Sequence, residues 1–112
     1  MRFWRPGSVL LAALLVLPRL GAAAATSGEQ IVLHGNDNGA LPCAACHGAT
    51  GAGNPATGAP ALAGLPAGVI EAALATMAKG QSGTALMQSI AAALSPADRQ
   101  AVAQYFAGLP KP

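Results

Sequence analysis

The residues best suited to chemistry form one short cluster, in which Cys43 and Cys46 are separated by two alanines and His47 follows directly. Two thiols three positions apart lie on one helical turn, so each can add to one vinyl group of the same porphyrin. The histidine that follows is then held against the porphyrin iron as an axial ligand. This spacing predicts one haem c, bound covalently through two thioether bonds to Cys43 and Cys46, with His47 as a ligand of the iron.

Three other uses of the same cysteines are less well supported by the sequence. A redox-active C-x-x-C site needs a strand–helix–strand setting, which the sequence does not show. A zinc site would have to recruit His34 as the fourth ligand beside Cys43, Cys46 and His47, and the chain holds few other candidate ligands. A disulfide between the two cysteines would close a very small, strained ring.

The first 25 residues have the order of a secretory signal peptide. Residues 1–5 form a short basic start, residues 9–17 an apolar run, and residues 21–25 are small. The apolar run is well short of the roughly 20 residues that span a bilayer. We therefore predict a signal peptide at 1–25, a single domain at 26–112 and a periplasmic location. An uncleaved interfacial anchor is the alternative, and the four alanines leave the exact cleavage site open.

Removal of the predicted signal peptide changes the charge of the protein. The whole chain has a formal charge of +2, whereas residues 26–112 carry three basic and four acidic side chains and therefore a net charge of −1. The chain has no cluster of Lys and Arg, so the sequence predicts no nucleic-acid binding. With so few charges, we expect weak electrostatic steering of partner proteins and a largely apolar docking surface.

The pattern of apolar, capping and breaking residues predicts helices and no strands. Helical segments are expected at about 27–35, 66–80, 83–94 and 95–108, and residues 48–64 form a long loop of small residues. Tyr105 and Phe106 are the only large aromatic residues after the predicted signal peptide. Because a small, alanine-rich domain buries little apolar area, its core needs to be completed by a cofactor, a metal or a partner.

Taken in order, these pieces resemble a known family. The pieces are a first helix ending near Gly35, the CAACHG motif, the segment 60–64, Met87 and a last helix beginning with LSPAD. In this order they are similar to class I cytochrome c of the small bacterial periplasmic monohaem type. The resemblance extends over essentially all of residues 26–112. It implies an all-α, small cytochrome c fold, with three to five helices wrapped around one covalently bound haem.

The resemblance also implies the second axial ligand. In the family, a methionine lies seven residues before the leucine of the last helix start, and Met87 lies seven residues before Leu94. Met87 is therefore expected to bind the iron opposite His47. Met77 lies on the apolar stripe of its predicted helix and is better explained as core. His34, which would give two histidine ligands, is better explained as a surface residue.

A proline after the haem-binding motif supports the axial histidine in this family. Its carbonyl oxygen accepts the second ring N–H of the histidine, which orients the ring and tunes the iron. Pro60, thirteen residues after His47, is the expected residue, with Pro55 and Pro66 as alternatives.

The family further packs a glycine of the first helix against an aromatic residue of the last helix. A glycine allows such close approach because it has no Cβ atom. Gly35 against Tyr105 or Phe106 is the pair that the resemblance implies.

An iron with both axial positions filled has no open site for a substrate, and it changes charge by one electron with little rearrangement. The predicted function is therefore a periplasmic one-electron carrier rather than an enzyme, either free or as the cytochrome subunit of a dehydrogenase or respiratory complex. The expected partners are redox proteins: a dehydrogenase as donor and an oxidase or another cytochrome as acceptor, with membrane contact only through a partner complex. The alternative is a haem-based sensor or binder of small ligands, which requires an open axial site in place of Met87.

Overall fold

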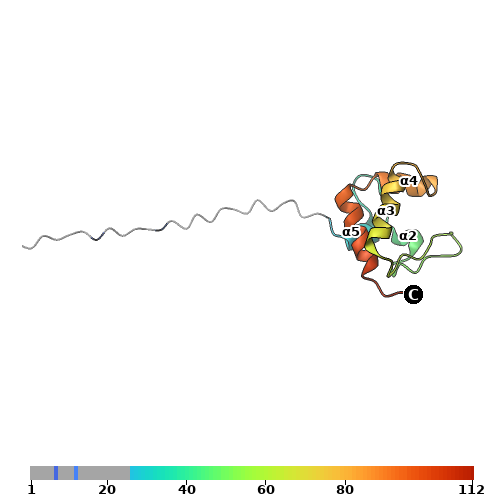
Figure 1. Cartoon of the computed structure of the whole chain (residues 1–112), viewed down its shortest axis with the longest axis horizontal. Coiled ribbons are helices and arrows are strands. Elements are labelled where there is room, and N and C mark those ends of the chain that lie inside the picture. The colour runs from blue at the N-terminus through green and yellow to red at the C-terminus, as the bar shows by residue number, and fades with distance from the viewer. Residues whose placement is uncertain (1–6, 8–11, 13–25) are drawn as a thin grey trace, which may run out of the picture.

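A computed structural model describes residues 7, 12 and 26–112, so the predicted signal peptide lies almost entirely outside the described residues. The described residues form five helices in chain order: α1 (Gly28–His34), α2 (Ala44–His47), α3 (Ala67–Ala78), α4 (Ala85–Ala92) and α5 (Pro96–Ala107). Figure 1 labels α2 to α5. The described residues contain no β-strand, and one isolated antiparallel bridge joins Asn54 and Ala59. The prediction of an all-α fold is confirmed. None of the helices in 26–112 is both long and apolar enough to cross a membrane.

Side-chain caps determine where three of the helices begin. The hydroxyl of Thr84 accepts a hydrogen bond from the backbone N–H of Met87 at 3.2 Å, which starts α4. Ser95 and Asp98 form a reciprocal capping box at the start of α5, with bonds of 3.0 and 3.1 Å. Ser27 caps α1 in the same way as Thr84 caps α4. These bonds satisfy backbone donors that have no partner within their helix, so the sequence fixes the register of α4 and α5 locally.

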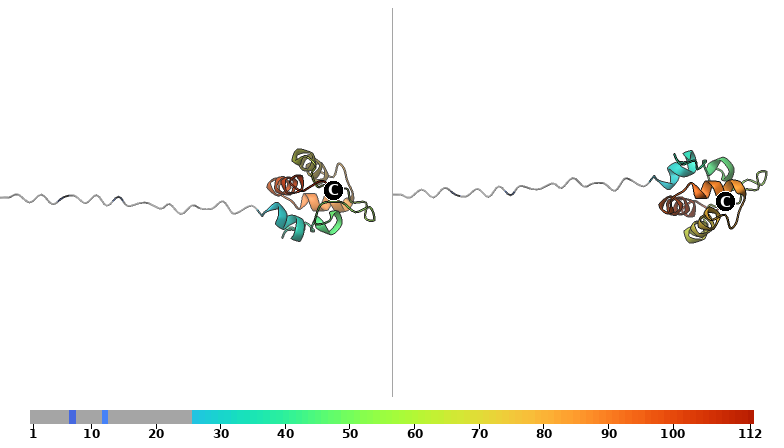
Figure 2. Two further views of the ribbon diagram at one scale, coloured as in Figure 1. Left: turned by 90° about the horizontal axis from the view of Figure 1, so that it is seen from below. Right: turned by 90° about the horizontal axis from the view of Figure 1, so that it is seen from above.

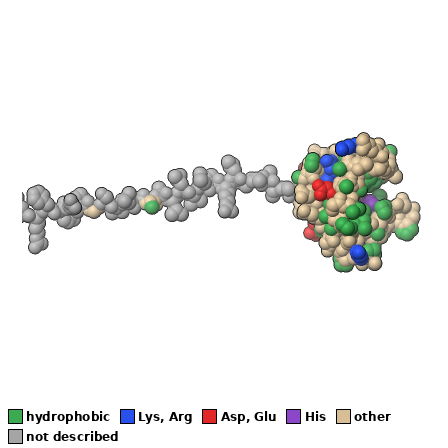
Figure 3. Space-filling model, in the orientation of Figure 1, with side chains coloured by type: hydrophobic (Ala, Val, Ile, Leu, Met, Phe, Trp, Pro, Cys, Tyr) green, Lys and Arg blue, Asp and Glu red, His purple; other side chains and the backbone are tan. Residues whose placement is uncertain are grey.

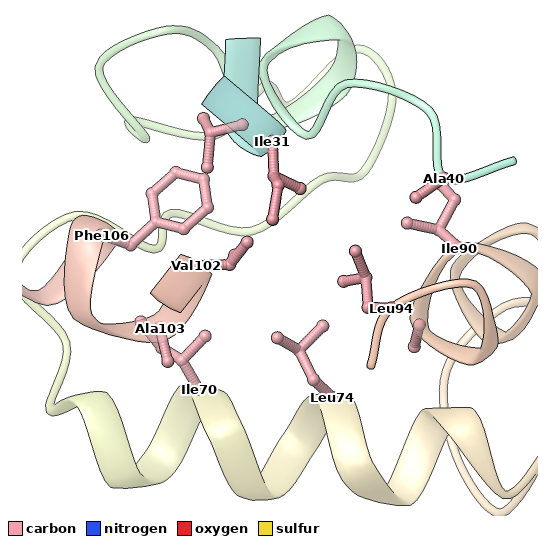
Figure 4. Packing of buried hydrophobic residues seen from close by; sticks show 11 residues of the cluster. Ile31, Ala40, Ile70, Leu74, Ile90, Leu94, Val102, Ala103 and Phe106 are labelled. Atoms are coloured by element: carbon pink, nitrogen blue, oxygen red, sulfur yellow. The ribbon is translucent and has the colours of Figure 1, made fainter. Parts of the chain in front are cut away.

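The helices pack so that α5 lies between α1 and α3, and α3 also packs against α4. The two views in Figure 2 place α1 and α2 on one side of the domain and α3 on the other, with α4 and α5 between them. The buried core consists of aliphatic side chains and one aromatic ring from these elements. Figure 4 shows them, among them Ile31, Ile70, Leu74, Ile90, Leu94, Val102 and Phe106.

The close contact between the first and last helices involves a different glycine from the one expected. Gly35 ends α1 with a φ of 73° and faces the backbone of Ala40 instead of α5. Gly28, at the start of α1, is the residue that approaches α5: a Cβ at this position would overlap the carbonyl oxygen of Ala101 and lie 3.0 Å from the Cβ of Tyr105. The expectation for Gly35 was therefore wrong, because its left-handed conformation is used to end the helix.

Candidate functional site

The cysteine–histidine motif forms its own short helix, α2. The carbonyl oxygen of Cys43 accepts the backbone N–H of His47 at 2.9 Å, which closes one helical turn over the motif. Cys43, Cys46 and His47 all line the same cleft. Both cysteines are free thiols and half-buried, so the disulfide alternative is not formed here. The single turn therefore presents two sulfur atoms and one imidazole to one cavity.

His47 is held by a hydrogen bond to the loop that follows it. The ring is buried, with 6% of the residue exposed, and Nδ1 lies 2.9 Å from the carbonyl oxygen of Pro60. A carbonyl oxygen can only accept, so Nδ1 carries the hydrogen, and in the neutral imidazole Nε2 is then the nitrogen with the lone pair. The structure thus brings together the two residues that the resemblance paired. It leaves His47 with one nitrogen available as a metal ligand.

A glycine in the loop allows Pro60 to reach His47. Gly53 has a φ of 78°, its N–H donates to the carbonyl oxygen of His47 at 2.9 Å, and a Cβ there would lie 2.7 Å from both the oxygen of Ala59 and the nitrogen of Ala61. The segment containing Pro60 therefore passes directly against the Gly53 backbone. Sequence reasoning did not single out Gly53, because five glycines lie between residues 48 and 64 and composition alone does not distinguish them.

The cleft has a volume of about 440 Å³ and an apolar wall. Its interior side chains belong to the hydrophobic core itself: Ile70, Leu74, Ile90, Leu94, Val102 and Phe106. No Asp, Glu, Lys or Arg of the described residues lines it. A large apolar cavity in a domain with few large side chains, with two thiols and an imidazole at its wall, fits a porphyrin with a central iron. The residues present therefore suit a covalently bound haem.

Both candidate methionines reach this cleft, and His34 does not. Met87 is half-buried in the first turn of α4 and lines the cavity. Met77, in the last turn of α3, also lines it, but its sulfur packs at Gly83, where it lies 2.6 Å from the position of an added Cβ. His34 is exposed at the end of α1. Geometry thus leaves Met87 and Met77 as the sulfur candidates at the cavity.

Burial also changes the acid–base behaviour of one thiol. Desolvation raises the pKa of Cys43 from 9.0 to about 11, and a hydrogen bond with its own backbone lowers it by less. Burial of Cys43 thus favours the neutral thiol over the thiolate. This agrees with an apolar wall, on which an ionised sulfur would be poorly solvated.

The zinc alternative has no geometric support in residues 26–112. The described residues bring together no group of three or more His, Cys, Asp or Glu side chains that could hold a metal ion. A closed zinc site needs four converging ligands. His34, the fourth ligand in that alternative, does not line the cleft.

The mouth of the cleft is apolar as well. Four side chains at its lining are between 37% and 56% exposed, and we call them the apolar rim: Leu41, Leu65, Val69 and Leu86. In the face shown in Figure 3, apolar side chains gather at the centre of the domain, and the few charged side chains are scattered toward its edges. A rim of this kind is typical of a surface that meets another protein.

Comparison with known proteins places this geometry in context. Residues 23–106 match a family described as cytochrome c oxidase, cbb3-type, subunit III. The chain is similar to the thiosulfate dehydrogenase electron acceptor of Stutzerimonas stutzeri, with 41% identity over 91 residues; the match covers 80% of this chain and 42% of that protein. The chain therefore spans less than half the length of this curated relative.

Solved structures show the same fold. The thiosulfate dehydrogenase TsdBA of Marichromatium purpuratum superposes with a TM-score of 0.71 and 33% identity, over 75% of this chain and 18% of that one. Cytochrome c4 of Acidithiobacillus ferrooxidans superposes with a TM-score of 0.69 and 31% identity, over 73% of this chain and 48% of that one. The expected small cytochrome c fold is therefore confirmed.

Proposed function

Because this chain belongs to the family of cytochrome c oxidase cbb3-type subunit III and is a small c-type cytochrome, we propose that it is a periplasmic one-electron carrier with a His/Met-ligated haem. Cys43 and Cys46 would form the two thioether bonds. His47 and Met87 would be the axial ligands, and Pro60 would orient His47. The family implies the covalent haem c; the assignment of these five residues is the proposal.

The hydrogen bond between His47 and Pro60 is the observation that carries this proposal. It fixes the imidazole in the tautomer whose Nε2 lone pair is free, and it does so inside an apolar cleft that also holds both thiols and Met87. A hydrogen bond to Nδ1–H increases the basicity of the ligating nitrogen.

The bound haem supplies an iron that takes up and releases one electron, and the surrounding residues set how readily it does so. The apolar side chains of the cleft exclude water and supply no counter-charge, which disfavours the more highly charged, oxidised state. A neutral thioether from Met87 acts in the same direction, whereas the Pro60 carbonyl acts in the other by increasing donation from His47. With His47 and Met87 both holding the iron, little reorganisation would accompany electron transfer.

The proposed partners follow from the relatives and from the apolar rim. One relative is named an electron acceptor of thiosulfate dehydrogenase, and a solved relative is a thiosulfate dehydrogenase itself. We infer that a dehydrogenase of this kind delivers electrons to this chain across the apolar rim, and that an oxidase or another cytochrome removes them. Export through a signal peptide at residues 1–25 would place the domain in the periplasm.

Expression of the full chain with a haem c maturation system tests the proposal. Denaturing mass spectrometry of the periplasmic protein is expected to show one covalently attached haem, and the oxidised protein to show the weak absorption band that reports methionine–iron bonding. Reduction of the oxidised protein by thiosulfate dehydrogenase and thiosulfate would support the proposed donor. A colourless protein with two free thiols would contradict the haem site. High-spin iron that binds CO readily would favour the small-ligand binder instead.

A further inference from the structure

We propose that Asn36 and Arg99 are positioning residues that hold the C-terminal end of α4 and thereby keep Met87 at the cleft. The inference rests on the proposed axial role of Met87. Among the described helices, α4 packs substantially only against α3. A helix of eight residues that packs against one other helix needs further contacts if Met87 is to keep a fixed position in the cleft.

Two side chains from outside α4 donate hydrogen bonds at its C-terminal end. The side-chain amide of Asn36 donates to the carbonyl oxygen of Ala93 at 2.9 Å. The guanidinium of Arg99 donates to the carbonyl oxygen of Leu94 at 2.7 Å and reaches that of Ala91 at 3.4 Å. Ala93 is the C-cap of α4 and Leu94 follows it, whereas the carbonyl of Ala91 within the helix already accepts the backbone N–H of Leu94. Carbonyls at a helix C-terminus carry partial negative charge, so an amide and a cation stabilise this end of α4.

One of the two side chains precedes α4 in the sequence, and the other follows it. Asn36 lies directly after α1, 57 residues before Ala93, and Arg99 lies in the first turn of α5. The Oδ1 atom of Asn36 also accepts the backbone N–H groups of Asn38 and Ala40, at 3.1 and 2.9 Å. Its side chain is therefore fixed within its own turn, and its amide nitrogen is aimed at α4. We call the hydrogen bonds that Asn36 and Arg99 donate at this end of α4 the clamp. The clamp connects the segments that carry Asn36 and Arg99 to the helix that carries Met87.

Asn36→Asp removes the Asn36 half of the clamp and keeps the turn at residues 36–40. Asn36→Asp retains an oxygen that accepts the two backbone N–H groups but replaces the donating amide with an oxygen that faces the carbonyl of Ala93. Asn38→Asp is the matched control, because it adds the same charge to the same turn at an exposed side chain. Arg99→Met tests the other half of the clamp, since it keeps a long stem and removes the donors.

The readout separates positioning from overall stability. Oxidised holoprotein is titrated with guanidinium chloride, and loss of the methionine–iron band is compared with loss of helical circular dichroism. In the wild type and Asn38→Asp we expect the two midpoints to coincide. In Asn36→Asp and Arg99→Met we expect the band to disappear at a clearly lower denaturant concentration than the helices, and amide hydrogens of α4 to exchange at least about fivefold faster.

Two results would overturn the inference, and they differ. If Met87→Ala abolishes the wild-type band but Asn36→Asp and Arg99→Met lose band and helicity together, as Asn38→Asp does, the clamp is wrong and the proposed function stands. If the wild-type holoprotein lacks the band, or Met87→Ala keeps it, Met87 is not the ligand, and the inference fails together with that part of the proposed function.

Discussion

The carbonyl oxygen of Pro60 lies 2.9 Å from Nδ1 of His47, although the two residues are thirteen positions apart. The contact exists because Gly53 lets the loop fold back on itself, with the backbone of residues 59–61 packed against it. The loop of small residues at 48–64 thus brings a hydrogen-bond acceptor to the buried imidazole.

The first prediction concerns the loop at Gly53. Gly53→Ala introduces a Cβ that overlaps the backbone of residues 59–61, so we expect the Pro60 carbonyl to move away from His47 and the redox potential to rise. Gly39→Ala is the matched control, because Gly39 also has a positive φ, of 99°, has nothing within 4 Å of an added Cβ and does not line the cleft. We expect Gly53→Ala to lose about 1–3 kcal/mol more unfolding free energy than Gly39→Ala. Equal potentials for the two variants would argue against the role of Pro60.

The second prediction distinguishes the two methionines of the cleft. Met87→Ala is expected to abolish the methionine–iron band, open the iron to CO and lower the potential, because a thioether ligand favours the reduced state. Met77→Ala should retain the band and lose about 1–3 kcal/mol of stability through lost packing. Visible spectroscopy and redox titration measure these effects. The reverse pattern would identify Met77 as the ligand.

A third prediction compares two helical glycines. Gly28→Ala places a methyl group against the carbonyl of Ala101, so we expect it to separate α1 from α5 and cost about 2 kcal/mol or more. Gly68→Ala, in the first turn of α3 with open space around it, should be neutral or stabilise by up to about 1 kcal/mol. Chemical denaturation of both holoproteins measures the difference. A tolerated alanine at Gly28 would mean that the two helices can shift apart without loss.

The fourth prediction concerns the apolar rim. Because residues 26–112 carry only seven charged side chains, electron transfer from the donor protein should change by less than about threefold between low and high ionic strength. Leu86→Gln should slow the reaction at every salt concentration, because it makes an exposed apolar rim residue polar. Lys111→Gln, away from the cleft lining, serves as the control. A steep fall in rate with salt would show that charges, and not the rim, guide docking.

The sequence by itself determined the features that depend on neighbouring residues. The spacing of Cys43, Cys46 and His47 is set within one helical turn, and the Ser95–Asp98 capping box closes over three residues. Such contacts need no knowledge of distant parts of the chain, so the motif and the helix starts can be read directly. The choice of Met87 and Pro60 required the family resemblance in addition, because other methionines and prolines have similar local settings.

Only the tertiary structure decided the contacts between distant segments. It identified Gly28 instead of Gly35 as the point where α1 meets α5, Gly53 as the residue against which the loop folds, and Asn36 as a tie to Ala93. Each depends on how whole helices pack, and packing is set by the summed burial of the core around the cleft. The presence of a glycine or an asparagine in the sequence does not predict which backbone segment will pack against it.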